Sequence, residues 1–155
     1  MIMIKNFLSI SYELQLKTLE WRNSTEVTKY FQIQDITLDT HVKWLKNLTK
    51  KPPKSVAFLI YWNQKPVGVT YLYNVDYAKY TCEWGMYIYD RKLRGKGIGK
   101  QVLDESILYA KQLGMNKMSL EVLSNNQHAL SLYTKTGFVE IESKKVKVRC
   151  FTKNI

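Results

Sequence analysis

The sequence is poor in the residues that build metal sites and disulfides. It has two cysteines and two histidines among 155 residues, and their spacing matches no zinc-binding pattern. We therefore expect no bound metal and two free, buried thiols, Cys82 and Cys150. No apolar run approaches the roughly 20 residues that span a bilayer, and the N-terminal "MIMIKNFLSI" lacks the basic start and cleavage site of a signal peptide. These absences predict a soluble, cytoplasmic protein.

Acidic residues are also scarce relative to basic ones. The chain has 24 Lys and Arg against 13 Asp and Glu, a formal net charge of +11. Such an excess favours an anionic partner, which could be nucleic acid, an anionic membrane face or a phosphorylated small molecule. The basic residues are spread over the chain, with one concentration at 91–100. This distribution favours a small phosphorylated ligand, with no nucleic acid and no membrane as partner.

The chain has three prolines, no low-complexity tract and no internal repeat, so we expect a single domain over residues 1–155. Alternating apolar residues predict a first strand from Ile2 to Leu8 and an antiparallel meander over residues 55–89. Helical spacing predicts helices near 14–21, over 37–48 with Thr37 or Asp39 as the cap, and from Ile98 to Gly114. The strand "KMSLEVL", the helix "NNQHALSLYTKTG" and the hairpin "FVEIESKKVKVRCFT" follow. This order predicts an α+β fold with a central, mostly antiparallel sheet flanked by helices.

The stretch "RKLRGKGIGK" joins the third strand of the meander to the long helix. A glycine-rich strand-to-helix junction leaves several backbone N–H groups aimed at one spot near the positive end of the helix dipole, which suits a pyrophosphate. Gly95 and Gly97 permit backbone angles that a side chain forbids, and Gly99 allows close packing of the first helical turn. The loop is not a P-loop, because the Gly-Lys-Ser/Thr ending is absent, and the meander before it excludes a Rossmann site.

The segment "RGKGIGKQVLDESI" resembles the acetyl-CoA loop of the GNAT superfamily of N-acetyltransferases, whose signature is Arg/Gln-x-x-Gly-x-Gly/Ala. Arg94, Gly97 and Gly99 fit this signature without gaps. The resemblance extends through "SLEVLSNNQHALSLYTKTGF" and covers roughly residues 55–142. It implies a mixed sheet with a V-shaped splay between two parallel strands, acetyl-CoA as the cosubstrate, and no metal.

The resemblance also implies which residues hold the cofactor. The backbone of Met86 and Ile88 would pair with the pantetheine arm as an added strand does. The side chain of Asn125 would hydrogen-bond the same arm. The pyrophosphate would lie on the loop amides, which belong to Arg94, Gly95, Lys96, Gly97, Ile98 and Gly99.

Acetyl transfer to an amine needs a base for the amine and an acid for the leaving thiolate. Tyr133 resembles the tyrosine that protonates the coenzyme A thiolate in this superfamily. Glu83 and Glu121 are the candidates for the base, because each lies in an apolar strand where burial would raise its pKa toward neutrality. An ordered chain of water molecules is the alternative.

The front of the chain should select the acceptor amine. The segments "LEWRN" and "ITLDTHVKWL" resemble two groups, the nucleotide amino-sugar N-acetyltransferases of pseudaminic acid biosynthesis and the N-terminal acetyltransferases that act on ribosomal proteins. We favour a nucleotide-linked amino sugar of the UDP-4-amino-4,6-dideoxy-N-acetylaltrosamine type, because aromatic residues are frequent here and the basic excess suits a diphosphate. The candidates for acceptor contact are Arg22, Asn23, His41 and Trp44.

Two further possibilities stay open at this point. A non-enzymatic module that binds acetyl-CoA or nucleic acid is compatible with the basicity, although Tyr133 would then have no task. An exposed final strand could pair with a second copy and form a homodimer.

Overall fold

The computed structural model describes all 155 residues and contains one seven-stranded mixed sheet. The strand order is β1-β2-β3-β4-β5-β7-β6, and only β4 and β5 pair in parallel. The strands are β1 (Ile2–Asn6), β2 (Val56–Trp62), β3 (Lys65–Asp76), β4 (Thr81–Ile88), β5 (Lys117–Leu123), β6 (Val139–Ile141) and β7 (Val148–Asn154). The predicted α+β class, the meander and the mostly antiparallel sheet are confirmed.

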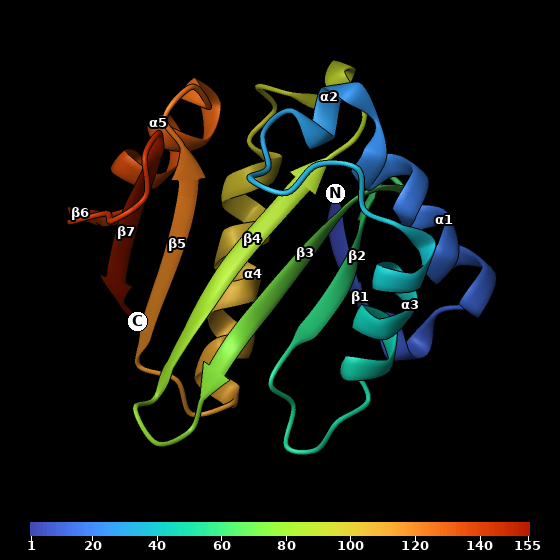
Figure 1. The fold of residues 1–155 in the computed structure, drawn as a ribbon, viewed down its shortest axis with the longest axis horizontal. Helices are drawn as coiled ribbons and strands as arrows, with labels where there is room; N and C mark the ends of the chain where they lie inside the picture. The colour runs from blue at the N-terminus through green and yellow to red at the C-terminus, as the bar shows by residue number, and fades with distance from the viewer.

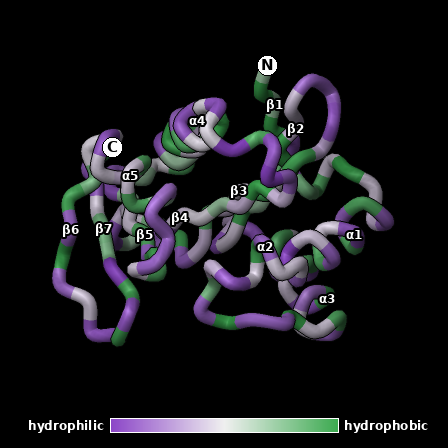
Figure 2. The backbone as a smooth tube through the Cα atoms, turned by 90° about the horizontal axis from the view of Figure 1, so that it is seen from above, coloured by the Kyte–Doolittle hydropathy of each residue, from purple (hydrophilic) through white to green (hydrophobic).

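Five α-helices flank the sheet: α1 (Tyr12–Asn23), α2 (Thr25–Thr28), α3 (Leu38–Asn47), α4 (Ile98–Gln112) and α5 (Gln127–Lys135). Seen from above, α4 lies on one side of the sheet and α1, α2 and α3 lie on the other (Figure 2). We call α1, α2 and α3 the front helices and their side of the sheet its front. They cover the β1 to β3 part of the sheet, and no helix covers the front of β5 and β7 (Figure 1).

Local signals explain where several elements begin and end. Thr37, and not Asp39, caps α3, since its side chain accepts from the N–H of Thr40. The first strand ends at Asn6 rather than Leu8, because the Asn6 side chain accepts from the N–H of Leu8 and starts the short 3-10 turn η1 (Phe7–Ser9). Gly114, with φ +91°, ends α4 as predicted.

The strands β4 and β5 separate along their length. They are registered only at Thr81 with Lys117, Cys82 with Met118 and Glu83 with Ser119. Beyond these pairs the two strands diverge toward their C-terminal ends (Figure 1). The sheet therefore has the predicted V-shaped splay, and it lies just before the glycine-rich segment.

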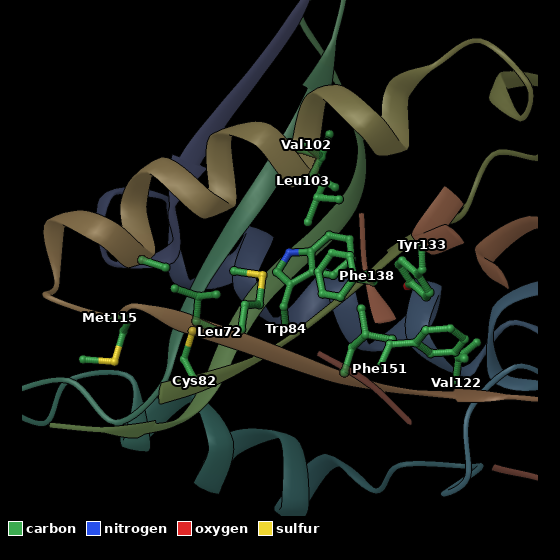
Figure 3. Packing of buried hydrophobic residues seen from close by; sticks show 14 of the residues in the cluster. Leu72, Cys82, Trp84, Val102, Leu103, Met115, Val122, Tyr133, Phe138 and Phe151 are labelled. Atoms are coloured by element: carbon green, nitrogen blue, oxygen red, sulfur yellow. The ribbon is translucent and has the colours of Figure 1, made fainter. Parts of the chain in front are cut away.

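Two apolar clusters stabilise the two sides of the sheet. The larger one lies under α4, where the buried Trp84 ring of β4 points toward Leu103 of α4 (Figure 3). The indole N–H of Trp84 donates to Thr70 Oγ1 at 2.8 Å, so this buried polar group is satisfied. The smaller cluster packs Phe7 and Trp21 against the front of the sheet.

Two expectations need correction. Both cysteines are free, but only Cys82 is buried; Cys150 is half-buried because it lies on the side of β7 that no helix covers. The final strand β7 is not an edge strand, since it is paired on both sides, with β5 and β6; the edge strands are β1 and β6. No helix has the length and apolar character needed to cross a membrane.

Candidate active site

A cleft of about 620 Å³ opens where β4 and β5 diverge. One end is formed by the glycine-rich loop and the start of α4, and the other end lies under the front helices. Its lining includes Arg94, Gly95, Gly97, Ile98, Gly99 and Lys100 at the loop end and Tyr30, Phe31, Gln32, Trp44, Tyr71, Tyr73 and Tyr87 at the front end. Glu121 of β5 and Tyr133 of α5 line the wall between these ends.

The glycine loop presents unpaired backbone donors to this cleft. Gly95 and Gly97 have φ +78° and +76°, which side chains rarely adopt. Gly97 is the N-cap of α4 and has no side chain to cap the helix. The first bond of the helix joins Gln101 N–H to Gly97 O, so the N–H groups of residues 98–100 have no helical acceptor. Such donors fit the pyrophosphate of acetyl-CoA.

The loop differs from the prediction at its start and in its side chains. We expected the N–H of Arg94 to bind a phosphate. It instead donates to Arg91 O at 3.1 Å and is not available. The guanidinium of Arg94 donates to Glu26 O at 3.2 Å, and Arg91 pairs with the Glu26 carboxylate at 3.1 Å. Lys96 does not line the cleft, whereas Lys100 does. The arginines thus tie the loop to α2.

Met86 and Ile88 have the backbone orientation that the prediction requires. Tyr89 N–H donates to Val67 O of β3, so residues 85, 87 and 89 direct their backbone groups toward β3. Because these directions alternate along a strand, Met86 and Ile88 direct theirs toward the splay, where β5 no longer pairs. Both residues line the cleft.

The structure places Asn125 outside the cleft lining and its neighbour Asn126 within it. The Asn126 side chain caps α5 by accepting from Ala129 N–H at 3.3 Å.

Tyr133 is 7% exposed and packs edge-on against Trp84, with ring centroids 5.9 Å apart. No hydrogen bond to another protein group occupies its hydroxyl, and every fully buried side-chain oxygen of the protein has a partner. The hydroxyl must therefore reach the open space of the cleft. Burial raises the pKa of Tyr133, with a further increase from Tyr71, so the phenol stays protonated.

Glu121 lines the cleft and joins two distant loops. It accepts from Gln32 Nε2 at 2.7 Å and from Lys145 Nζ at 3.1 and 3.2 Å. Burial alone would raise its pKa, but the hydrogen bonds from Gln32 and Lys145 and the charge of Lys145 bring the pKa below its usual value. The expectation of a raised pKa is wrong for Glu121, because this carboxylate has a cationic partner.

Glu83 lies outside the cleft, in a separate polar hollow. Its carboxylate accepts a hydrogen bond from the Asn74 side chain. Both predicted carboxylates approach Tyr73, whose pKa is raised by burial and then by Glu83, Tyr71 and Glu121.

Of the four predicted acceptor contacts, only Trp44 lines the cleft. Arg22 donates to Thr28 Oγ1 and Ile33 O and lies 3.7 Å from the ring centroid of Phe31. Asn23 donates to Ile36 O and accepts from Ile36 N–H. Both side chains hold the loop between α2 and α3 in place.

His41 also lies outside the lining and is 6% exposed. Its Nε2 lies 3.0 Å from Gln15 O and 3.4 Å from Thr18 Oγ1, between α1 and α3. Burial lowers its pKa, and the contact with Gln15 O offsets part of that change.

Three residues at the front end were not singled out as site residues from the sequence: Gly85 and Tyr87 of β4, and Gln32 of the loop between α2 and α3. Tyr87 donates to Thr18 O at 3.2 Å, and its pKa is raised by burial. Gly85 makes room for Tyr71, as a Cβ there would lie 2.7 Å from the Tyr71 ring. The alternation of Glu83, Gly85 and Tyr87 along one face of β4 is a signal that could have found two of them. No group of His, Cys, Asp or Glu side chains is suited to hold a metal ion.

The fold is similar to several solved structures, some of which are N-acetyltransferases. A domain from Methanocaldococcus jannaschii superposes with a TM-score of 0.84 at 21% identity, covering 100% of this chain and 99% of the other. The Campylobacter jejuni N-acetyltransferase PseH in complex with acetyl coenzyme A superposes with a TM-score of 0.74 at 22% identity, covering 99% of both chains. At these identities the likeness concerns the fold.

Sequence comparison points the same way. A putative phosphinothricin acetyltransferase of Bacillus subtilis is 28% identical over 108 residues, which is 69% of this chain and 66% of that protein. The chain spans between about half and two thirds of the length of the first curated relatives it matches, 66% and 53%. Residues 15–138 match the model of the acetyltransferase (GNAT) family, whose acyl donor is acetyl-CoA. The predicted fold is confirmed, and the chain belongs to the acetyltransferase (GNAT) family.

Proposed function

We propose that this chain transfers the acetyl group of acetyl-CoA to the amine of a nucleotide-linked amino sugar. The proposal depends mainly on one observation: a single cleft runs from the free amides of the glycine loop, past Tyr133, to an aromatic front end. A donor on the loop and an acceptor at the front end would meet at the splay.

The chain's own groups are suited to hold the donor. The unpaired N–H groups at the start of α4 would bind the pyrophosphate, with Lys100 beside them. The backbone of Met86 and Ile88 would bind the pantetheine amides along the unpaired edge of β4. Acetyl-CoA supplies the thioester whose C–S bond breaks as the amide C–N bond forms.

Tyr133 would donate its hydroxyl proton to the leaving thiolate, and its raised pKa means that the phenol carries this proton in the resting protein. The proton of the acceptor amine would go to Glu121 or Glu83, directly or through water. Glu121 borders the cleft, whereas Glu83 would act from the adjoining hollow. The lowered pKa of Glu121 keeps it ionised and able to hold an ammonium group before proton transfer.

The front end fits a flat or ring-shaped acceptor. Phe31, Trp44, Tyr71 and Tyr87 line it, and aromatic faces stack on sugar rings and nucleobases. The similarity to PseH is compatible with this acceptor, although it extends only to the fold.

The test is release of free thiol when the protein, acetyl-CoA and a UDP-linked 4-amino sugar are mixed. Tyr133→Phe should slow release by about 100-fold without changing the affinity for acetyl-CoA, because only the proton donor is removed. Tyr109→Phe is the matched control, since Tyr109 of α4 packs against Phe58 of β2, away from the cleft. Equal rates for Tyr133→Phe and wild type would contradict the assigned role of Tyr133.

The same assay separates the alternatives. Turnover of a peptide N-terminus but of no amino sugar would assign the chain to protein N-terminal acetylation. Binding of acetyl-CoA without thiol release on any amine would indicate a binding module and refute the proposal.

A further inference from the structure

A second hollow, of about 370 Å³, lies at the end of β4 and β5 where the two strands are still paired. It is polar, and its lining comprises Asn74, Asp76, Lys79, Thr81, Cys82, Glu83, Lys117 and Ser119. Neither the glycine loop nor α5 contributes to it.

The hollow and the cleft share one side of the sheet. Cys82 and Trp84 are buried on the α4 side, so Thr81 and Glu83 point to the opposite side. On β5, Met118 and Leu120 are buried in the same way, which leaves Lys117, Ser119 and Glu121 in one row on the opposite side. This side of β5 has no helix over it (Figure 1). A polar row therefore leads from Glu121 in the cleft to Lys117 in the hollow.

The row has a defined length and order. Glu121 lies four positions after Lys117, a distance of about 13 Å along a strand. Glu83 and Ser119 are registered across the two strands in the middle of this path, and Thr81 and Lys117 are registered at its end. From Glu121 toward the hollow, the row thus presents carboxylate and hydroxyl groups first and cationic groups last.

The two lysines of the hollow are free to bind an anion. Lys79 and Lys117 are exposed, and neither takes part in any ion pair of the protein. The two carboxylates of the hollow form no ion pair with either lysine: Asp76 Oδ1 accepts from the N–H groups of Ala78 and Lys79 at 2.9 and 3.0 Å, and Glu83 accepts from Asn74.

The front end of the cleft offers no comparable cation. Arg22 is engaged behind Phe31 and does not line the cleft, and Lys145 is paired with Glu121. Arg94 and Lys100 lie at the cofactor loop. Among the lysines and arginines that line the cleft or the hollow, Lys79 and Lys117 are those that neither lie at the cofactor loop nor pair with a carboxylate.

We infer that the hollow is an acceptor subsite for a phosphate group. Lys79, Lys117 and the Thr81 hydroxyl would hold this phosphate, about 13 Å along β5 from Glu121. The acceptor class is a phosphorylated polyhydroxy amine, whose hydroxyls face Glu83 and Ser119 and whose amine lies at the splay. This inference rests on the proposed function, since it assigns the far end of the same acceptor.

The experiment is calorimetric titration of UDP into the protein saturated with coenzyme A, which blocks the glycine loop as a phosphate site. We expect UDP to bind, uridine to bind at least tenfold more weakly, and Lys79→Ala and Lys117→Ala each to weaken UDP binding by about fivefold or more. Lys54→Ala is the matched control, because Lys54 is an exposed lysine near the same end of the sheet and outside the hollow. Melting temperatures establish that each variant folds.

Three results would overturn the inference: no UDP binding, equal affinities for UDP and uridine, or unchanged UDP affinity in both lysine variants. Failure of the proposed function has a different signature. Normal UDP binding without thiol release would remove the enzymatic proposal and leave the subsite in place, whereas thiol release with unchanged UDP affinity in both variants would do the reverse.

Discussion

At Gly85 of β4, a Cβ atom would lie 2.7 Å from Cε2 and 2.8 Å from the hydroxyl oxygen of Tyr71. Real Cβ contacts are longer, so any side chain at this position displaces the Tyr71 ring from the front end of the cleft. Burial raises the pKa of Tyr71 to about 12, with a smaller opposing effect of Arg22, so the phenol beside Gly85 stays protonated.

We predict that Gly85→Ala lowers the free energy of unfolding by about 1 to 3 kcal/mol, the usual cost of overpacking. It should raise the KM for the acceptor and leave the KM for acetyl-CoA unchanged, because the glycine loop is not touched. Urea unfolding and thiol-release kinetics measure the two effects. Adding Tyr71→Ala should recover part of the lost stability; strict additivity of the two substitutions would contradict the proposed contact.

At the scale of elements, a buried histidine, His41, joins α1 and α3. His41 Nε2 lies within hydrogen-bonding distance of Thr18 Oγ1 and of Gln15 O, which can only accept from it, and burial holds the pKa of His41 below the usual 6.5. In the unfolded chain the imidazole binds a proton as the pH falls through 6.5, whereas in the folded protein it does so only at lower pH. Acid therefore favours the unfolded state in this window.

We predict that the free energy of unfolding, measured in urea, decreases between pH 7.5 and pH 5.5, and that His41→Asn makes this dependence smaller. His128 provides the control, because it lies on α5, away from the contact between α1 and α3. If His128→Asn flattens the dependence as much as His41→Asn does, the assignment to His41 is wrong.

The elements were readable from the sequence because their signals are local. The periodicity of α4, the Asn63–Gln64 turn between β2 and β3 and the glycine spacing of the loop each depend on neighbouring residues. The roles of Arg22, Asn23 and His41 depend on partners 6 to 26 positions away. Hydrogen bonds to these partners engage the side-chain polar atoms that we expected to contact the acceptor. Glu121 differs from expectation for the same reason, since Lys145 approaches it from 24 positions along the chain.

At the scale of the whole molecule, the net charge of +11 acts on every anionic ligand before contact. We predict that the association rate of acetyl-CoA, followed by the fluorescence of Trp84 and Trp44 in the cleft lining, falls by about tenfold or more from low to high ionic strength. Acetylpantetheine, which lacks the phosphates, is the matched ligand. If both ligands lose rate equally, the charge of the protein does not steer the cofactor.

The register of β5 carries one more consequence. This strand is matched to β7 at seven positions and to β4 at only three. The last quarter of the chain, from β5 onward, thus pairs mainly within itself and joins the rest of the sheet along a short seam. The candidate cleft lies where the two parts of this single sheet separate, and any substitution that let β4 and β5 pair further would add hydrogen bonds between the strands while closing the cleft.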